Sequence, residues 1–226
     1  MNAMRLIYTS LIAGAGVLSL AAQPRTFPLD STDGLKLNKV SAEAVSFKGR
    51  KAIRVTEPAG APSQREDRLV ILAGAEFEDG TIEVDLAGQP GGGATEGARG
   101  FVGVAFRVAP DLSKYECFYL RPTNGRADDQ VRRNHSAQYV SFPDFPWPKL
   151  RKEFPEKYES YVDLVPGEWT KVRIEVGGVK ARLYVHGNQQ PTLVVNDLKL
   201  GPAKGAIALW IGPGTLAHFS NLRIGK

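Results

Sequence analysis

The feature that most limits the fold of this chain is a recurring short run in which apolar and polar side chains alternate. Glycine, proline, asparagine and aspartate separate these runs, and no long segment shows the roughly 3.6-residue period of an amphipathic helix. Many short alternating segments divided by turn residues are typical of an antiparallel sandwich or barrel. We therefore expect an all-β chain, with strands in segments such as TIEVDLAG, FVGVAFRV, YECFYL, TKVRIEV, KARLYV and GAIALWI.

The two faces of these runs differ from one run to another. In TKVRIEV, the side chains of Val172, Ile174 and Val176 share one face, and charged side chains occupy the other. In FVGVAFRV and YECFYLR, the second face carries small residues, tyrosines and arginines instead. Successive side chains of a strand point to opposite faces. We therefore expect a sandwich in which one sheet is convex and solvated, while the other is concave and lines a groove.

Residues 1–22 have the pattern of a secretory signal peptide. A basic residue precedes an apolar run at positions 6–20, and the small residues Ala21 and Ala22 follow. The run is shorter than the about 20 apolar residues of a membrane-spanning helix; an uncleaved anchor is the alternative. We expect cleavage after Ala21 or Ala22 and a secreted or periplasmic protein without a membrane partner. Residues 23–226 would then form a single domain.

The composition argues against several classes of protein. The single cysteine, Cys117, cannot form an internal disulfide, and we expect a buried thiol. The net charge of +5 is scattered, with no long basic run, so we expect no nucleic-acid partner. The sequence also lacks a Gly-x-Ser-x-Gly motif, a phosphate-binding loop, a dinucleotide fingerprint and a zinc-binding pattern. We therefore expect no metal site of this kind and no cofactor.

The last third of the chain carries a family resemblance. It contains GEWTKVRIEVGGVKARLYVHGN, then GAIALWIG, and it ends in HFSNLRIGK. In this order the segments resemble the concanavalin A-like lectin and glucanase superfamily, in particular the bacterial 3-keto-disaccharide hydrolase-like and laminin-G-like domains. The resemblance covers about residues 68–226. It implies a jelly-roll sandwich of two antiparallel sheets with a concave sheet commonly used for carbohydrates, and it is specific for the fold rather than for an activity.

Enzymes of the glucanase branch of this superfamily have a catalytic strand motif that is incomplete in this sequence. Laminarinase-like enzymes carry two glutamates with an aspartate between them on one strand. The run IEVDLAGQ provides Glu83 and Asp85 but no second glutamate. A retaining glycosidase needs two carboxyl groups about 5–5.5 Å apart. We therefore interpret Glu83 and Asp85 as part of a solvated strand face.

A polar segment, RADDQVRRNHSAQY at residues 126–139, follows the expected strand that ends near Arg121. Proline, asparagine and glycine end that strand, so the segment should begin as a loop at one end of the groove-side sheet. There Asp128 and Asp129 could bond sugar hydroxyls or hold a calcium ion, and His135 could be a general base. An ion-paired loop without a ligand is the alternative.

Two classes of function compete for this site. An enzyme similar to the 3-keto-disaccharide hydrolase-like domains would use His135 with Asp128 or Asp129 as its acid–base pair. Arg121 would then stabilise developing charge. A non-catalytic carbohydrate-binding module needs only a groove with aromatic side chains. A laminin-G-like module that recognises protein is a third alternative.

The segment 141–161 is rich in proline and aromatic residues, with one expected helical turn near residues 149–157. Trp147, between two prolines, is our candidate for an exposed ring, whereas we expect Trp169 in the core. Trp210 is expected to face the groove. We expect a monomer that binds carbohydrate. The substrate-binding candidates are Arg107, Tyr119, Arg121, Arg133, Asn134, Gln138, Trp147 and Trp210.

Overall fold

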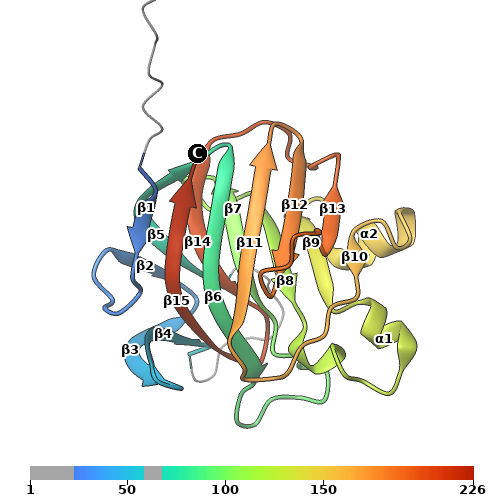
Figure 1. Cartoon of the computed structure of the whole chain (residues 1–226), viewed down its shortest axis with the longest axis horizontal. Coiled ribbons are helices and arrows are strands. Elements are labelled where there is room, and N and C mark those ends of the chain that lie inside the picture. Colours follow the sequence, from blue (N-terminus) through green and yellow to red (C-terminus); the bar gives the residue numbers. More distant parts are fainter. Residues whose placement is uncertain (1–22, 59–67) are drawn as a thin grey trace, which may run out of the picture.

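Two antiparallel β-sheets packed face to face make up the computed structural model, which describes residues 23–58 and 68–226 (Figure 1). The predicted all-β jelly-roll sandwich of two antiparallel sheets is confirmed. The predicted signal peptide lies outside the described residues. Within the described ranges, no helix has the length and apolar character needed to cross a membrane.

Sheet A is the layer nearest the viewer in Figure 1, and its strand order is β13-β12-β11-β6-β15-β4-β3, with β1 paired to β15. A hairpin at Gly177 and Gly178 joins two of these strands. The bounds are β1 (Arg25–Phe27), β3 (Ser41–Phe47), β4 (Arg50–Thr56), β6 (Gly80–Pro90), β11 (Thr170–Gly177), β12 (Lys180–Val185), β13 (Leu193–Val195) and β15 (Thr215–Gly225).

Sheet B lies behind sheet A, in the order β10-β9-β8-β7-β14-β5-β2. Two short helices and a 3-10 turn lie beside the β9 end of this sheet, at the right of Figure 1. The bounds are β2 (Leu35–Asn38), β5 (Arg68–Phe77), β7 (Val102–Val108), β8 (Tyr115–Leu120), η1 (Pro122–Asn124), α1 (Gln130–Asn134), β9 (Ala137–Phe142), α2 (Trp147–Glu153), β10 (Glu159–Ser160) and β14 (Gly205–Ile211).

The core between the sheets follows the alternation in the sequence. Val172, Ile174 and Val176 of β11 are buried, as predicted, while the charged side chains between them face outward. On sheet B, Val102 points toward sheet A, because a Cβ added to Gly88 of β6 would lie 2.6 Å from its Cγ1 atom. The intervening small residues of β7 therefore lie on the outer face of sheet B.

Three local expectations differ from the structure or gain detail from it. The polar segment contains helix α1, which begins because the side chain of Asp129 accepts a hydrogen bond from the backbone nitrogen of Arg132. The expected helical turn near residues 149–157 is α2, which begins slightly earlier. Trp169 is not in the core: it is half-buried on the outer face of sheet A. Cys117 is fully buried, as expected.

Candidate functional site

A row of side chains crosses the outer face of sheet B from β14 to β10. Strand register pairs Trp210 with Gly103, and Gly103 with Tyr119. It then pairs Tyr119 with Gln138, and Gln138 with Glu159. Directly paired residues of antiparallel strands point to the same face. The Tyr119 and Trp210 rings meet across the glycine with centroids 4.7 Å apart, so the row has an aromatic half and a polar half.

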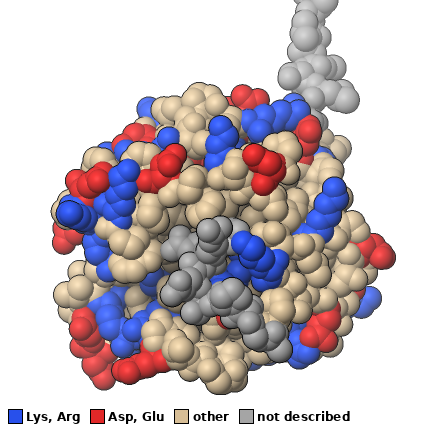
Figure 2. Space-filling view, turned by 180° about the vertical axis from the view of Figure 1, so that it is seen from behind, with Lys and Arg blue, Asp and Glu red and all other residues tan. Residues whose placement is uncertain are grey.

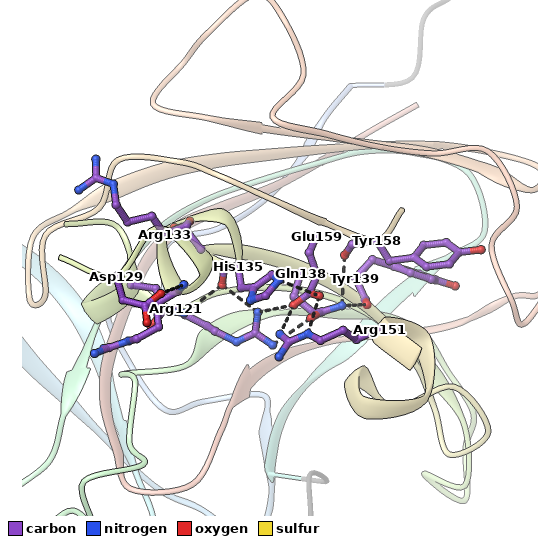
Figure 3. A network of polar contacts seen from close by, with 12 residues as sticks. Arg121, Asp129, Arg133, His135, Gln138, Tyr139, Arg151, Tyr158 and Glu159 are labelled. Atoms are coloured by element: carbon purple, nitrogen blue, oxygen red, sulfur yellow. Dashed lines mark hydrogen bonds and ion pairs between the residues drawn. The ribbon is translucent and has the colours of Figure 1, made fainter. Parts of the chain in front are cut away.

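Glu159 is the centre of a buried ion cluster at the β10 end of this row (Figure 3). Its carboxylate accepts hydrogen bonds from Nη1 of Arg121 at 3.2 Å, from Nε of Arg151 at 2.9 Å and also from Nη2 of Arg151. The side chains of Arg121 and Glu159 are 5% and 3% exposed, whereas Arg151 is 36% exposed. We call Glu159, Arg121, Arg151 and His135 the Glu159 cluster.

The carboxylate of Glu159 stays ionised in this setting. Burial by itself would raise its pKa, because a charged group loses solvation in a protein interior. The hydrogen bonds from Arg151 and the charges of Arg121 and Arg151 outweigh burial, so the pKa of Glu159 is lowered. Glu159 is therefore a fixed acceptor at neutral pH rather than a proton donor.

The guanidinium of Arg121 forms hydrogen bonds to residues of several elements around the cluster. Its Nη2 donates to Oη of Tyr119 and Oε1 of Gln138, each at 2.9 Å, and its Nη1 donates to the carbonyl of His135 at 2.9 Å. Together with Glu159, these acceptors use four of the about five N–H donors of a guanidinium. Arg121 therefore orients Glu159 and the tyrosine, and it has little capacity left for a ligand.

His135 follows α1 and points toward Glu159. Its Nε2 lies 3.6 Å from Oε2 of Glu159, beyond hydrogen-bond distance. Burial lowers the pKa of His135 and outweighs the carboxylate of Glu159, so the ring is neutral at neutral pH. The predicted pairing of His135 with Asp128 or Asp129 is not formed. Asp129 caps α1 and Asp128 is exposed, so the carboxylate beside His135 is that of Glu159.

Trp147 lies beside the cluster and is open to solvent, as predicted. The residue is 37% exposed and opens α2 between Pro146 and Pro148. The guanidinium carbon of Arg151 lies 4.6 Å from its ring centroid, and that of Arg121 lies 5.9 Å away. An exposed indole can stack on an apolar sugar face while the partly exposed guanidinium of Arg151, held by the buried carboxylate of Glu159, bonds its hydroxyls.

Arg107, which we expected in the groove, is part of a different network. It lies at a bulge in β7, is 1% exposed, and has a positive φ of 54°. Its guanidinium donates to the carboxylate of Asp79 at 2.9 Å and to the carbonyls of Glu78, Gly178 and Gly201. The bulge turns Arg107 away from the row and into a link between three loops.

Two further candidates also lie apart from the cluster. Arg133 points away from Glu159 in Figure 3 and donates to Oη of Tyr161 at 3.0 Å. Asn134 is exposed, and its side-chain oxygen accepts from Nε2 of Gln130 at 2.7 Å. The structure therefore brings together Tyr119, Arg121, His135, Gln138 and Trp147, with Trp210 farther along the row.

The sequence prediction missed Glu159 and Arg151. Glu159 belongs to a strand of two residues, which is too short to show alternation, and Arg151 reaches the site from α2.

Figure 2 shows the sheet B side of the molecule, with acidic and basic side chains interspersed along its left edge, where α1 and α2 lie.

The chemistry available at the cluster is limited. Glu159 is the one carboxylate that pairs with both Arg121 and Arg151 among the described residues. Within the same ranges, no group of three or more histidine, cysteine, aspartate or glutamate side chains could hold a metal ion. The arrangement is suited to recognising a polar ligand through fixed hydrogen bonds and one exposed ring.

Comparison with known proteins identifies the fold. No family model and no curated protein matches the chain. The carbohydrate-binding module CBM66 from Bacillus subtilis superposes with a TM-score of 0.58 and 12% identity, over 85% of this chain and 96% of that chain. A Bacillus subtilis protein with a galectin-like fold gives 0.56 and 12% identity, over 91% and 96%.

A third similar structure is the Crh5 transglycosylase in complex with NAG, with a TM-score of 0.50 and 15% identity, over 92% of this chain and 85% of that chain. At such low identities the likeness concerns the fold alone. It supports the concanavalin A-like architecture predicted from the sequence, without singling out the 3-keto-disaccharide hydrolase-like or laminin-G-like domains.

Proposed function

We propose that this protein binds carbohydrate on the outer face of sheet B, at the Glu159 cluster and Trp147. The observation that carries the proposal is the exposed Trp147 ring beside a carboxylate held in place by two arginines. Arg151 is half-exposed and keeps Nη1 without a bond in the described part of the chain, so it can donate to a hydroxyl. The neutral His135 ring provides an acceptor next to it, and Glu159 holds Arg151 in place.

The fold neighbours are consistent with this proposal. One is named as a carbohydrate-binding module, and another is a transglycosylase in complex with NAG. Fold alone does not fix function, so the proposal rests on the site residues of this chain.

Binding is favoured over hydrolysis by the protonation states at the cluster. A glycosidase needs a carboxylic acid to protonate the leaving oxygen and a second carboxylate. Glu159 has a lowered pKa and is ionised, and neither Asp128 nor Asp129 approaches it. The second candidate function, cleavage of a bond next to an oxidised sugar, would have to use the neutral His135 as a base.

The experiment that tests the proposal is a binding screen of the mature chain against soluble and insoluble polysaccharides. We expect at least one saccharide to bind, and Trp147→Ala to abolish or strongly weaken that binding. Leu37→Ala is the matched control, because Leu37 is 49% exposed on β2, at the opposite edge of the same sheet. Equal binding by wild type and Trp147→Ala would contradict the proposal.

The same screen separates binding from catalysis. Released oligosaccharides or new reducing ends, lost in His135→Ala, would favour the enzyme. We expect binding without product release. Export of the chain and its monomeric state stay predictions, which can be checked by the N-terminal residue of the secreted protein and by its mass in solution.

A further inference from the structure

An open pocket lies on the outer face of sheet A, on the other side of the sandwich from the Glu159 cluster. It has a volume of about 470 Å³ and is lined by residues of β4, β6, β11 and β15 and by neighbouring loop residues. It contains Glu83 and Asp85, which we expected on a solvated strand face, and Trp169, which we expected in the core. The site proposed above uses none of these residues.

The turn between β3 and β4 and the end of β3 contact Trp169, which lines this pocket, and its neighbour Glu168. Phe47 meets Trp169 edge to face, with ring centroids 5.6 Å apart, and Nε1 of Trp169 donates to the carbonyl of Phe47 at 3.4 Å. Next to these rings, Lys48 of the turn forms an ion pair with Glu168. The indole of Trp169, which immediately precedes β11, is therefore held in one orientation against the sheet.

The floor of the pocket contains an oriented carboxylate. Oδ2 of Asp85 accepts from Nη1 of Arg50 at 2.9 Å and from Nδ2 of Asn221 at 3.0 Å. Asn221 has a φ of 54° and lies in an irregular part of β15, between Ser220 and Arg223. Such an irregularity turns side chains out of the regular register, and here it presents Asn221 and Arg223 to the pocket.

Three charged groups of the pocket have no ion pair or hydrogen bond in the part of the chain that the structure describes: Lys171, Arg223 and Glu83. Asp85 is already neutralised by Arg50. The uncompensated set therefore consists of two cations and one carboxylate, an excess of one positive charge. Donors and acceptors of both kinds beside an aromatic ring suit a hydroxylated ring, and the excess charge favours one that bears an anion.

We propose that this pocket binds an acidic sugar unit of the uronate type, with its ring against Trp169 and its carboxylate at Lys171 and Arg223. Hydroxyls of the sugar would bond the carboxylates of Asp85 and Glu83. This site is independent of the Glu159 cluster, so one chain would carry two saccharide sites on opposite faces.

The test is calorimetric titration with a trimer of galacturonic acid and with its methyl ester, which keeps the ring and removes the charge. We expect the acid to bind at about 50 mM salt and more weakly at about 300 mM, because salt screens exposed charges. Binding of the ester should be at least about tenfold weaker. Lys171→Gln together with Arg223→Gln should abolish the preference for the acid.

Two single variants locate the site. Trp169→Ala should weaken binding of the acid, whereas Trp147→Ala should leave it unchanged. If Trp169→Ala does not fold, the exposed Lys171→Gln and Arg223→Gln changes still decide the question. No binding of the acid, equal binding of acid and ester, or a loss caused by Trp147→Ala alone would overturn the proposal. None of these results depends on whether the Glu159 cluster binds another saccharide.

Discussion

Replacing Glu159 by glutamine should destabilise the fold through the charge that it leaves behind. Arg121 is 5% exposed and would lose its only carboxylate partner in the described part of the chain, whereas Arg151 is 36% exposed and can regain water. Removing one partner of a buried pair costs about 3–5 kcal/mol. Glutamine retains the shape and one acceptor oxygen, so we expect the lower end, about 3 kcal/mol.

Urea unfolding followed by circular dichroism measures this loss, provided that the slope of the transition is unchanged. In a domain of about 200 residues, a loss of this size lowers the thermal midpoint by about 6–12 °C. Glu168→Gln is the matched control, because Glu168 forms a single ion pair with Lys48 and both side chains are largely exposed. That change should cost less than about 1 kcal/mol. An equally small loss in Glu159→Gln would mean that Arg121 does not depend on Glu159 for compensation of its buried charge.

The remaining predictions concern single residues. His135→Ala should abolish saccharide binding and change the free energy of unfolding by no more than about 0.5 kcal/mol. Asp129→Ala should keep binding and lower the free energy of unfolding by about 1 kcal/mol, because α1 loses its cap. Loss of stability with unchanged binding in both variants would favour an ion-paired loop with a structural role only. Arg107→Met should lower stability by about 3 kcal/mol in urea unfolding without affecting binding, because it leaves the acceptors of the loops around β7 without their donor. Burial and, secondly, the charge of Arg54 lower the pKa of His218 to about 4. The unfolded chain takes up this proton below about pH 6.5, so the contribution of His218 to the free energy of unfolding should be constant above that pH and fall by up to about 3 kcal/mol toward pH 4. Urea unfolding at several pH values should show that His218→Phe loses this pH dependence. The same dependence of the free energy of unfolding on pH in wild type and variant would contradict the prediction.

The strand faces could be predicted because they depend on local alternation alone. The faces of β8, of β11 and of β7 before its bulge follow directly from the period of two, and they place Tyr119 and Arg121 on the outer face of sheet B. The exposure of Trp147 was also predictable, because Pro146 and Pro148 keep its segment away from a sheet.

Contacts between distant segments could not be predicted in the same way. Glu159 reaches the site because β10 pairs with β9, and a strand of two residues is too short for its sequence to predict that pairing. The cap that Asp129 forms on α1 could not be predicted, because an aspartate before a short helix and an aspartate in a ligand loop look alike in sequence. Arg107 fits the alternating pattern of its strand, but the bulge turns it out of register.

The most direct test of carbohydrate binding on sheet B uses the three tryptophans as separate reporters. Trp147 is exposed beside the Glu159 cluster, Trp169 lies on the outer face of sheet A, and Trp210 is buried in the row on sheet B. Fluorine NMR of protein labelled with 5-fluorotryptophan, with each signal assigned by substitution, follows all three during titration with a saccharide from the screen. We predict a saturable shift of the Trp147 signal. Saturable binding of that saccharide with an unchanged Trp147 signal would mean that it does not bind beside the Glu159 cluster.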